Sequence, residues 1–415
     1  MVRSLYPYIF VILALITVGQ WLSINWWSFN LTSFFIECCL CFFILIYPCF
    51  RFKQIKKLRR DKAYSFFNIY VIYTVILSIY TLINFSMEGQ RSDFAQLALY
   101  NMAMVSCLCI YTLSYPQWFI FAWKELYRFL PWIALIYMPF AKDDLFGDLM
   151  GFLCMPAILI LLFWQDLPRN QKFIWLTFAI IIIISSYFGD ARSNVIKYLL
   201  ALLLGFSLYW DKFYDKIRNL VWIFFISPFV LFFLGATNVF NVFEADKYLD
   251  TKSFKEESIA DTRTVVYTEA ITSALNNKYA VFGRGIGRGY DSQFQEWLSN
   301  QSNSSFSKLH SSERQSEAGI LNVFTWGGII YILIFTISCM AVVYYGLYKS
   351  NNRFIRNVAI YFAFYYFYSW IENFQSFSII YLSSFSFIAI CLSPFFRGMD
   401  NTKIKNCLWF LFKNK

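Results

Sequence analysis

The sequence predicts an all-α polytopic membrane protein with one long polar loop. Of its 415 residues, 59% are hydrophobic and only 15% are charged. Apolar runs long enough to cross a bilayer recur along the chain and predict about 12 transmembrane helices. Lys and Arg gather in the short connections between these runs, as membrane orientation requires. One polar stretch, residues 237–317, separates the ninth span from the tenth.

The expected spans divide the chain into four parts. Spans one to nine occupy 1–236, the polar loop 237–317, spans ten to twelve 318–396, and a tail 397–415. Pro131 and Pro139 are expected to shorten and kink the fifth span, and the tenth is long enough to tilt strongly or project from the bilayer. In chain order, the spans are expected at residues 5–24, 31–50, 64–85, 95–113, 127–141, 149–164, 173–189, 194–210, 219–236, 318–347, 357–372 and 376–395.

The distribution of basic residues predicts the orientation of the chain. The connection at residues 51–60 reads RFKQIKKLRR, and the other Lys and Arg residues outside the loop also concentrate on its side. The positive-inside rule places that side and both termini in the cytoplasm, and the loop at 237–317 outside. The net charge of +11 therefore reflects orientation more simply than binding of nucleic acid, for which we expect no role. A lipid-headgroup role for residues 51–60 is the less favoured alternative.

The ten Cys residues do not predict a metal centre or a disulfide framework. All of them lie in apolar spans or in the tail, and none lies in the polar loop. Cys107 and Cys109 have too few potential partner ligands nearby in the sequence for a zinc site. We expect no metal and no cofactor.

Ionisable residues at the outer ends of spans are candidates for function, because charge near the membrane interior needs a reason. Arg192 occupies a tight connection between two spans and faces the same side as the polar loop. Lys197 follows it by five residues, so the two do not share a helix stripe; it either snorkels to the interface or contributes to a site. Glu372 and Glu37 are most simply interfacial charges.

The polar loop contains a predicted helix from residue 262 to about residue 276. Asp261 can cap it, and one apolar stripe suited to the membrane boundary is formed by Val266, Ala270, Ile271, Ala274 and Leu275. Arg263 lies in its first turn, where a cation opposes the helix dipole. Either an anionic ligand or a salt bridge with a nearby acid would offset this placement.

A glycine-alternating run follows the helix, GRGIGRG at residues 283–289. It lacks the Gly-Lys-Ser/Thr of a P-loop and the context of a dinucleotide fingerprint. Exposed amides with two guanidinium groups suit a phosphate, and a flexible turn with solvated charges is the alternative. The candidate substrate-binding residues here are Gly283, Arg284, Gly285, Arg288 and Tyr290.

The chain re-enters the membrane after a second cluster of charges. Residues 312–315 read SERQ, a capping box that predicts a helix start near Ser312, with Arg314 and Glu317 on one face. His310, the single His of the chain, precedes it, and without a second ligand it does not indicate a metal site. Glu317, entering the membrane beside guanidinium groups, is either an ion-pair partner or a base.

This inventory suits transfer of a glycan from a lipid-linked phosphate donor. Arg side chains offset the negative charge of a diphosphate leaving group. Glu or His takes the proton from an attacking sugar hydroxyl. No Ser–His–Asp arrangement is visible in the sequence.

The residues resemble the superfamily of bacterial O-antigen polymerases (Wzy-type) and O-antigen ligases. The resemblance rests on Asp190-Ala-Arg192-Ser, Thr262-Arg263-Thr, Phe282-Gly-Arg-Gly-Ile-Gly and Ser316-Glu-Ala-Gly…Trp326-Gly-Gly, and covers about residues 175 to 345. It implies a GT-C-like, metal-independent transferase of the bacterial inner membrane, with undecaprenyl-diphosphate-linked glycans as donor and acceptor. Arg192 and Arg263 would hold the donor diphosphate. Membrane lipids and a chain-length regulator are the other expected partners.

Within this superfamily, the polymerases are the closer match. The ligases carry a His where this chain has Ser316 or Glu317, and His310 is displaced from that position. We therefore expect a polymerase with Glu317 rather than His310 as the base. A ligase is the first alternative. A lipid-linked glycan flippase is an alternative of another class, and it would need charges spread through both leaflets.

Overall fold

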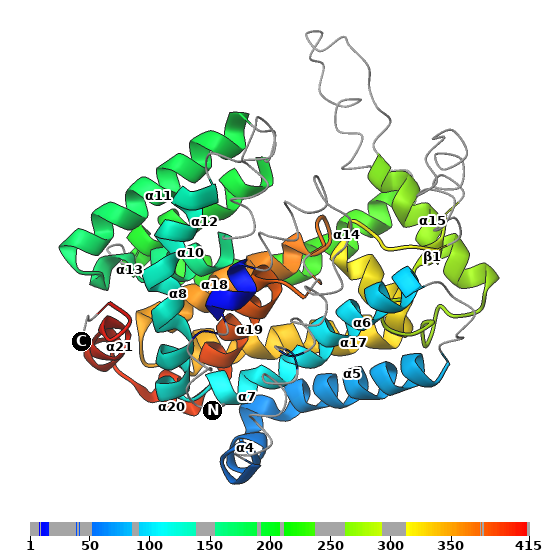
Figure 1. Cartoon of the computed structure of the whole chain (residues 1–415), viewed down its shortest axis with the longest axis horizontal. Coiled ribbons are helices and arrows are strands. Elements are labelled where there is room, and N and C mark those ends of the chain that lie inside the picture. The colour runs from blue at the N-terminus through cyan, green and yellow to red at the C-terminus, as the bar shows by residue number, and fades with distance from the viewer. Residues whose placement is uncertain are drawn as a thin grey trace.

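The computed structural model describes residues 8, 10–15, 39, 41, 52–84, 91–137, 154–188, 192–207, 211–236, 262–292, 313–373, 375 and 377–412. Its described part consists of helices and a single ribbon of two very short strands, so the all-α class is confirmed (Figure 1). The ribbon pairs β1 (Tyr290–Asp291) with β2 (Glu313–Arg314) in antiparallel register.

The helices of the described part are named here in chain order. In the first half they are α4 (Phe52–Arg59), η2 (Lys62–Tyr64), α5 (Ser65–Ile83), α6 (Arg91–Val105), η3 (Ser106–Leu108), α7 (Cys109–Leu113), α8 (Pro116–Tyr137), α10 (Cys154–Leu161), η5 (Trp164–Asp166), α11 (Arg169–Phe188) and α12 (Arg192–Ser207). In the second half they are α13 (Asp211–Leu220), α14 (Ile223–Ala236), α15 (Thr262–Asn276), α17 (Gly319–Tyr348), α18 (Arg353–Tyr368), α19 (Ile379–Leu392), α20 (Pro394–Gly398) and α21 (Asn401–Trp409).

Two helices in the described part are long and apolar enough to cross a membrane, Lys62–Ile83 and Gly319–Tyr348. A third candidate exists if Leu97–Leu113 and Pro116–Ile133, which are separated by a bend of 119°, form one broken span. Pro131 lies inside α8, which begins at Pro116, well before the predicted start of the fifth span. The expected spans at 5–24 and 31–50 fall largely outside the described residues.

α17 is the centre of the packing. It contacts α5, α15, α18 and α19, and Figure 1 shows α5 running beside it. Tyr331 is fully buried, stacks on Tyr70 with ring centroids 5.7 Å apart, and shares a 2.8 Å hydrogen bond with Thr74. Buried aromatic pairs with satisfied hydroxyls stabilise a helix interface beyond their area alone.

A break at Gly328 divides α17 into two helices. Gly328 has φ +66° and ψ −166°, a conformation that residues with a side chain rarely adopt. The apolar run expected as the tenth span is therefore helical and long enough to cross a membrane, with a break at Gly328 that the sequence did not predict. The second piece, residues 329–348, is about 30 Å long, close to the thickness of a bilayer core, whereas the first piece ends at the break.

Candidate functional site

Three helices from separate parts of the chain meet the segment at the end of α18. The amides of Gly319 and Ile320, at the start of α17, donate to the carbonyls of Glu372 (3.2 Å) and Ser369 (2.9 Å). Tyr267 of α15 donates its hydroxyl to the carbonyl of Trp370 (2.6 Å). Two residues of α12, Ser193 and Lys197, contact the same segment. We call the whole group the helix-end junction; it comprises residues 368–372 together with Ser193, Lys197, Tyr267, Gly319 and Ile320.

Glu372 joins α12 to this junction through its side chain. Ser193 Oγ donates to Glu372 Oε1 at 3.1 Å, and Lys197 Nζ lies 2.5 Å from Oε2. Lys197 is only 7% exposed, and its ammonium also lies 4.9 Å from the ring centroid of Tyr368. Lys197 therefore does not snorkel, and Glu372 is more than an interfacial charge.

The helix predicted from residue 262 is confirmed as α15, and its stripe is buried only in part, because Leu275 is 64% exposed. Val266 is 6% exposed, and Ala270 and Ala274 are fully buried. α15 packs against α17 and β1, so the stripe faces protein as well as any membrane boundary. Arg263 is the second residue of α15, one helical turn before Tyr267, which places its backbone near the junction.

The junction thus gathers the backbone positions of three predicted site residues. Arg192 is the first residue of α12 and directly precedes Ser193. Glu317, whose side chain is exposed, lies two residues before Gly319. Arg263 belongs to the first turn of α15. The side chains of Arg192 and Arg263 and the whole of His310 lie outside the described parts of the structure.

The turn that carries Glu317 is held by a buried amide. Asn322, 1% exposed, accepts from the amide of Ser316 (2.7 Å) and donates to its carbonyl (3.0 Å). Ser316 Oγ accepts from the amide of Ala318 at 3.0 Å. The main chain on both sides of Glu317 is fixed by these bonds, while its side chain faces outward.

The predicted helix start near Ser312 is wrong. Glu313 and Arg314 form strand β2, and α17 begins at Gly319. Arg314 and Glu317 consequently do not share a helix face. The bonds between Asn322 and Ser316, six residues apart, instead hold the turn that precedes the helix start at Gly319.

The glycine run fits into the break of α17. The amides of Arg284 and Gly285 donate to the carbonyls of Thr325 and Trp326 (both 2.9 Å), and that of Gly283 donates to Tyr279 (2.7 Å). A Cβ at Gly283 would lie 2.3 Å from the amide nitrogen of Gly327. The expectation of exposed amides is therefore wrong at residues 283–285, where the glycines permit close packing.

Arg284 and Tyr290 are also built into the fold. Arg284 donates to the carbonyl of Gly289 (2.9 Å) and to Asp291 (3.1 Å), and lies 4.8 Å from the ring centroid of Tyr279. Burial raises the pKa of the Tyr279 phenol, which stays neutral and bonds to Ser273. Tyr290 is 1% exposed in β1, which leaves little surface for a ligand. Arg288, in the same segment, is half-buried.

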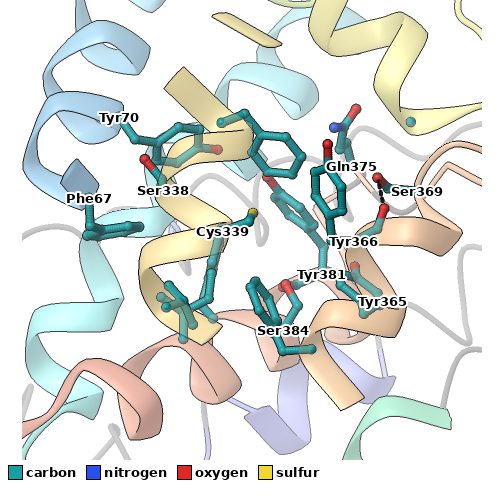
Figure 2. A pocket seen from close by; sticks show the side chains of 16 residues that line it. Phe67, Tyr70, Ser338, Cys339, Tyr365, Tyr366, Ser369, Gln375, Tyr381 and Ser384 are labelled. Atoms are coloured by element: carbon teal, nitrogen blue, oxygen red, sulfur yellow. Dashed lines mark hydrogen bonds between the residues drawn. The ribbon is translucent and has the colours of Figure 1, made fainter. Parts of the chain in front are cut away.

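An aromatic cavity opens beside the junction, between α5, α17, α18 and α19. Figure 2 shows Tyr366, Tyr381 and Gln375 around the open space, which has a cavity volume of about 40 Å³ and is partly open to the exterior. Its serine hydroxyls point back into the protein: Ser338 donates to Phe66, Ser369 to Tyr366 and Ser384 to Tyr381. The full lining is Phe67, Tyr70, Gly319, Phe335, Ser338, Cys339, Val342, Phe362, Tyr365, Tyr366, Ser369, Gln375, Tyr381, Ser384, Phe385 and Ile388.

Sequence reasoning missed this cavity and the role of Glu372. The cavity residues come from four helices, and in the sequence they look like any other aromatic core. The only signal for Glu372 was a charge at the end of an apolar run. Across the described ranges, no group of three or more His, Cys, Asp or Glu residues is placed to hold a metal ion.

Comparison with known proteins adds no identity to this geometry. No protein-family model, no curated protein and no solved structure matches the chain.

Proposed function

We propose that the chain is a glycan polymerase. In this proposal it joins undecaprenyl-diphosphate-linked repeat units at the outer face of the bacterial inner membrane, as a multi-pass, GT-C-like protein with both termini in the cytoplasm. The observation that carries the proposal is the helix-end junction, because three helix starts that bear Arg192, Arg263 and Glu317 converge there.

The junction is suited to a diphosphate. The starts of α12, α15 and α17 each carry the positive end of a helix dipole, and the first amides of α17 are bonded to the carbonyls of Glu372 and Ser369. Such ends bind phosphate groups, and Arg side chains in the first turns of α12 and α15 add bidentate donors. Positive charge at this place stabilises the diphosphate as it departs with the electron pair of the broken bond.

Glu317 supplies the base for the other half of the reaction. A hydroxyl of the acceptor sugar attacks C1 of the donor sugar, the C1–oxygen bond to the diphosphate breaks, and the hydroxyl proton passes to Glu317. A base needs a fixed position, and the bonds of Asn322 and Ser316 provide one for the main chain at Glu317. No cofactor enters this scheme.

The aromatic cavity supports a lipid-linked substrate. Two of its lining residues, Gly319 and Ser369, belong to the junction, so a ligand with its diphosphate at the junction can extend hydrocarbon into the cavity. Rings and aliphatic side chains dominate its walls, and such surfaces favour apolar ligands.

The test of the proposed function is the banding pattern of surface lipopolysaccharide in a deletion strain. A lost polymerase leaves single repeat units on the surface glycan. A lost ligase leaves long chains on the lipid carrier, and a lost flippase leaves units that never reach the outer face. Full-length glycan bands in the deletion strain would refute all three, and re-expression of the chain is the control.

A further inference from the structure

Glu372 connects two helix starts with two different parts of one residue. Its carboxylate accepts from Ser193 (3.1 Å) and Lys197 (2.5 Å) of α12, whereas its carbonyl accepts from the amide of Gly319 (3.2 Å) at the start of α17. Glu372 lies 179 residues after Ser193 and 175 residues after Lys197 in the sequence. Glu372 therefore bridges the helix that begins with Arg192 and the turn that carries Glu317.

The ammonium of Lys197 is buried against the carboxylate of Glu372. Its side chain is 8% exposed, that of Glu372 37%, and the Tyr368 ring is 4.9 Å from Nζ. Lys197 also lies five residues beyond Arg192, about 7.5 Å further along the axis of α12 from the helix start. A buried ammonium with a carboxylate at 2.5 Å is strongly committed to that partner.

We propose that Lys197 and Glu372 are positioning residues that hold the start of α12 in register with the start of α17. Lys197 acts on the reaction through Glu372 and does not bind the donor diphosphate, so it is not the substrate-binding residue for which the sequence made it a candidate. This inference rests on the proposed function for its kinetic consequence, whereas the register between the two helices is a property of the fold. Misplacement of reacting groups by about 1 Å can cost on the order of a hundredfold in rate.

The first experiment measures the register directly and needs no activity. Spin labels are introduced as genetically encoded residues at Leu199 on α12 and at Phe282 beside the break of α17, both exposed side chains. The distance distribution is measured by pulsed electron resonance in nanodiscs for the unaltered pair, Glu372→Gln, Lys197→Met and the exchange Lys197→Glu with Glu372→Lys. We expect the single variants to broaden or shift the distribution and the exchange to restore it.

The second experiment separates positioning from donor binding. With purified lipid-linked repeat unit, we expect Lys197→Met and Glu372→Gln to lower kcat at least about thirtyfold while KM for the donor changes less than about threefold. The exchange variant recovers at least about tenfold of that loss. The matched control removes the ion pair between Lys405 and Asp166, 3.3 Å apart on α21 and η5, by Lys405→Met, which leaves both measurements unchanged.

Two results overturn the inference. One is an unaltered distance distribution in both single variants. The other is a rise in KM for the donor without rescue by the exchange, which would make Lys197 a direct ligand of the diphosphate. If the exchange variant does not fold, Glu372→Gln alone decides through the distance measurement. An unaltered chain that makes no polymer refutes the proposed function, and the distance measurement still decides the register.

Discussion

Gly328 lies with its α-carbon against the carbonyl of Val281. A Cβ at Gly328 would sit 2.1 Å from Val281 O, and the adjacent amide of Ile329 donates to the carbonyl of Ala280 at 2.9 Å. The break in α17 and the segment that leads into the glycine run are therefore one structural unit. This unit fixes where the first piece of α17 ends.

Gly328→Ala is expected to disrupt this unit. The new Cβ would overlap the Val281 carbonyl, and alanine rarely adopts the positive φ of this position. The two segments must therefore separate, which lowers the free energy of unfolding by at least about 2 kcal/mol. We expect a lower unfolding temperature in detergent and loss of long glycan chains. Gly398→Ala is the matched control, because a Cβ there meets no atom within 4 Å. Equal unfolding temperatures for the two variants would contradict the prediction.

A second prediction concerns orientation. Reporters inserted at Ser302 in the polar loop and after Lys415 are expected to report opposite sides, the loop outside and the terminus in the cytoplasm, because Lys and Arg cluster on the side of residues 51–60. Alkaline phosphatase and a fluorescent protein make the two measurements. The reverse pattern would place the helix-end junction on the cytoplasmic side and remove the proposed reaction from it.

Local patterns in the sequence predicted the elements better than their ends. The apolar stripe of α15 and the apolar run of α17 are local, and both helices form. The start of α17 was misplaced because a SERQ box competes with the pairing of Asn322 and Ser316, which no short motif describes. The break at Gly328 depends on Val281, a residue distant in the sequence. The two adjacent glycines, Gly327 and Gly328, therefore did not predict it by themselves.

The candidate site was predictable only as a set of unexplained charges. Arg192, Arg263 and Glu317 stand at helix starts or just before one, and the junction that gathers them depends on bonds from Tyr267 and Gly319 to the end of α18. Glu372 pairs with Lys197 across 175 residues, beyond any periodicity. The glycine run misled because glycines that permit close packing resemble glycines that bind phosphate.

A third prediction concerns the donor diphosphate. Arg192→Ala and Arg263→Ala are each expected to abolish polymerisation without loss of expression, and Lys at either position is expected to restore little. A point charge does not replace the bidentate fork of a guanidinium on a diphosphate. Chain length on gels is the measurement, and Arg60→Ala, an exposed residue after α4, is the control that keeps full activity. Normal chain length in either Ala variant would remove that Arg from the donor site.

The last prediction identifies the base. Glu317 lies two residues before the start of α17, beside the junction. The turn that contains it is held by hydrogen bonds between Asn322 and the main chain of Ser316 and between the amide of Ala318 and Ser316 Oγ. A base must stay within hydrogen-bond reach of the proton that it accepts, so a fixed turn at the junction favours Glu317 over His310. Glu317→Gln keeps the shape of the side chain and removes its basicity.

We expect Glu317→Gln to lower the rate of polymerisation at least about a hundredfold, the scale of a lost acid–base group, and His310→Ala to lower it clearly less. Both are measured as initial rates with purified lipid-linked repeat unit, and Glu125→Gln, in a surface pair with Arg128, is the control. An inactive His310→Ala with long chains from Glu317→Gln would reverse the two roles. Because the ligases of the resembling superfamily use a His in this region, that reversal would also favour transfer to a different acceptor over polymerisation.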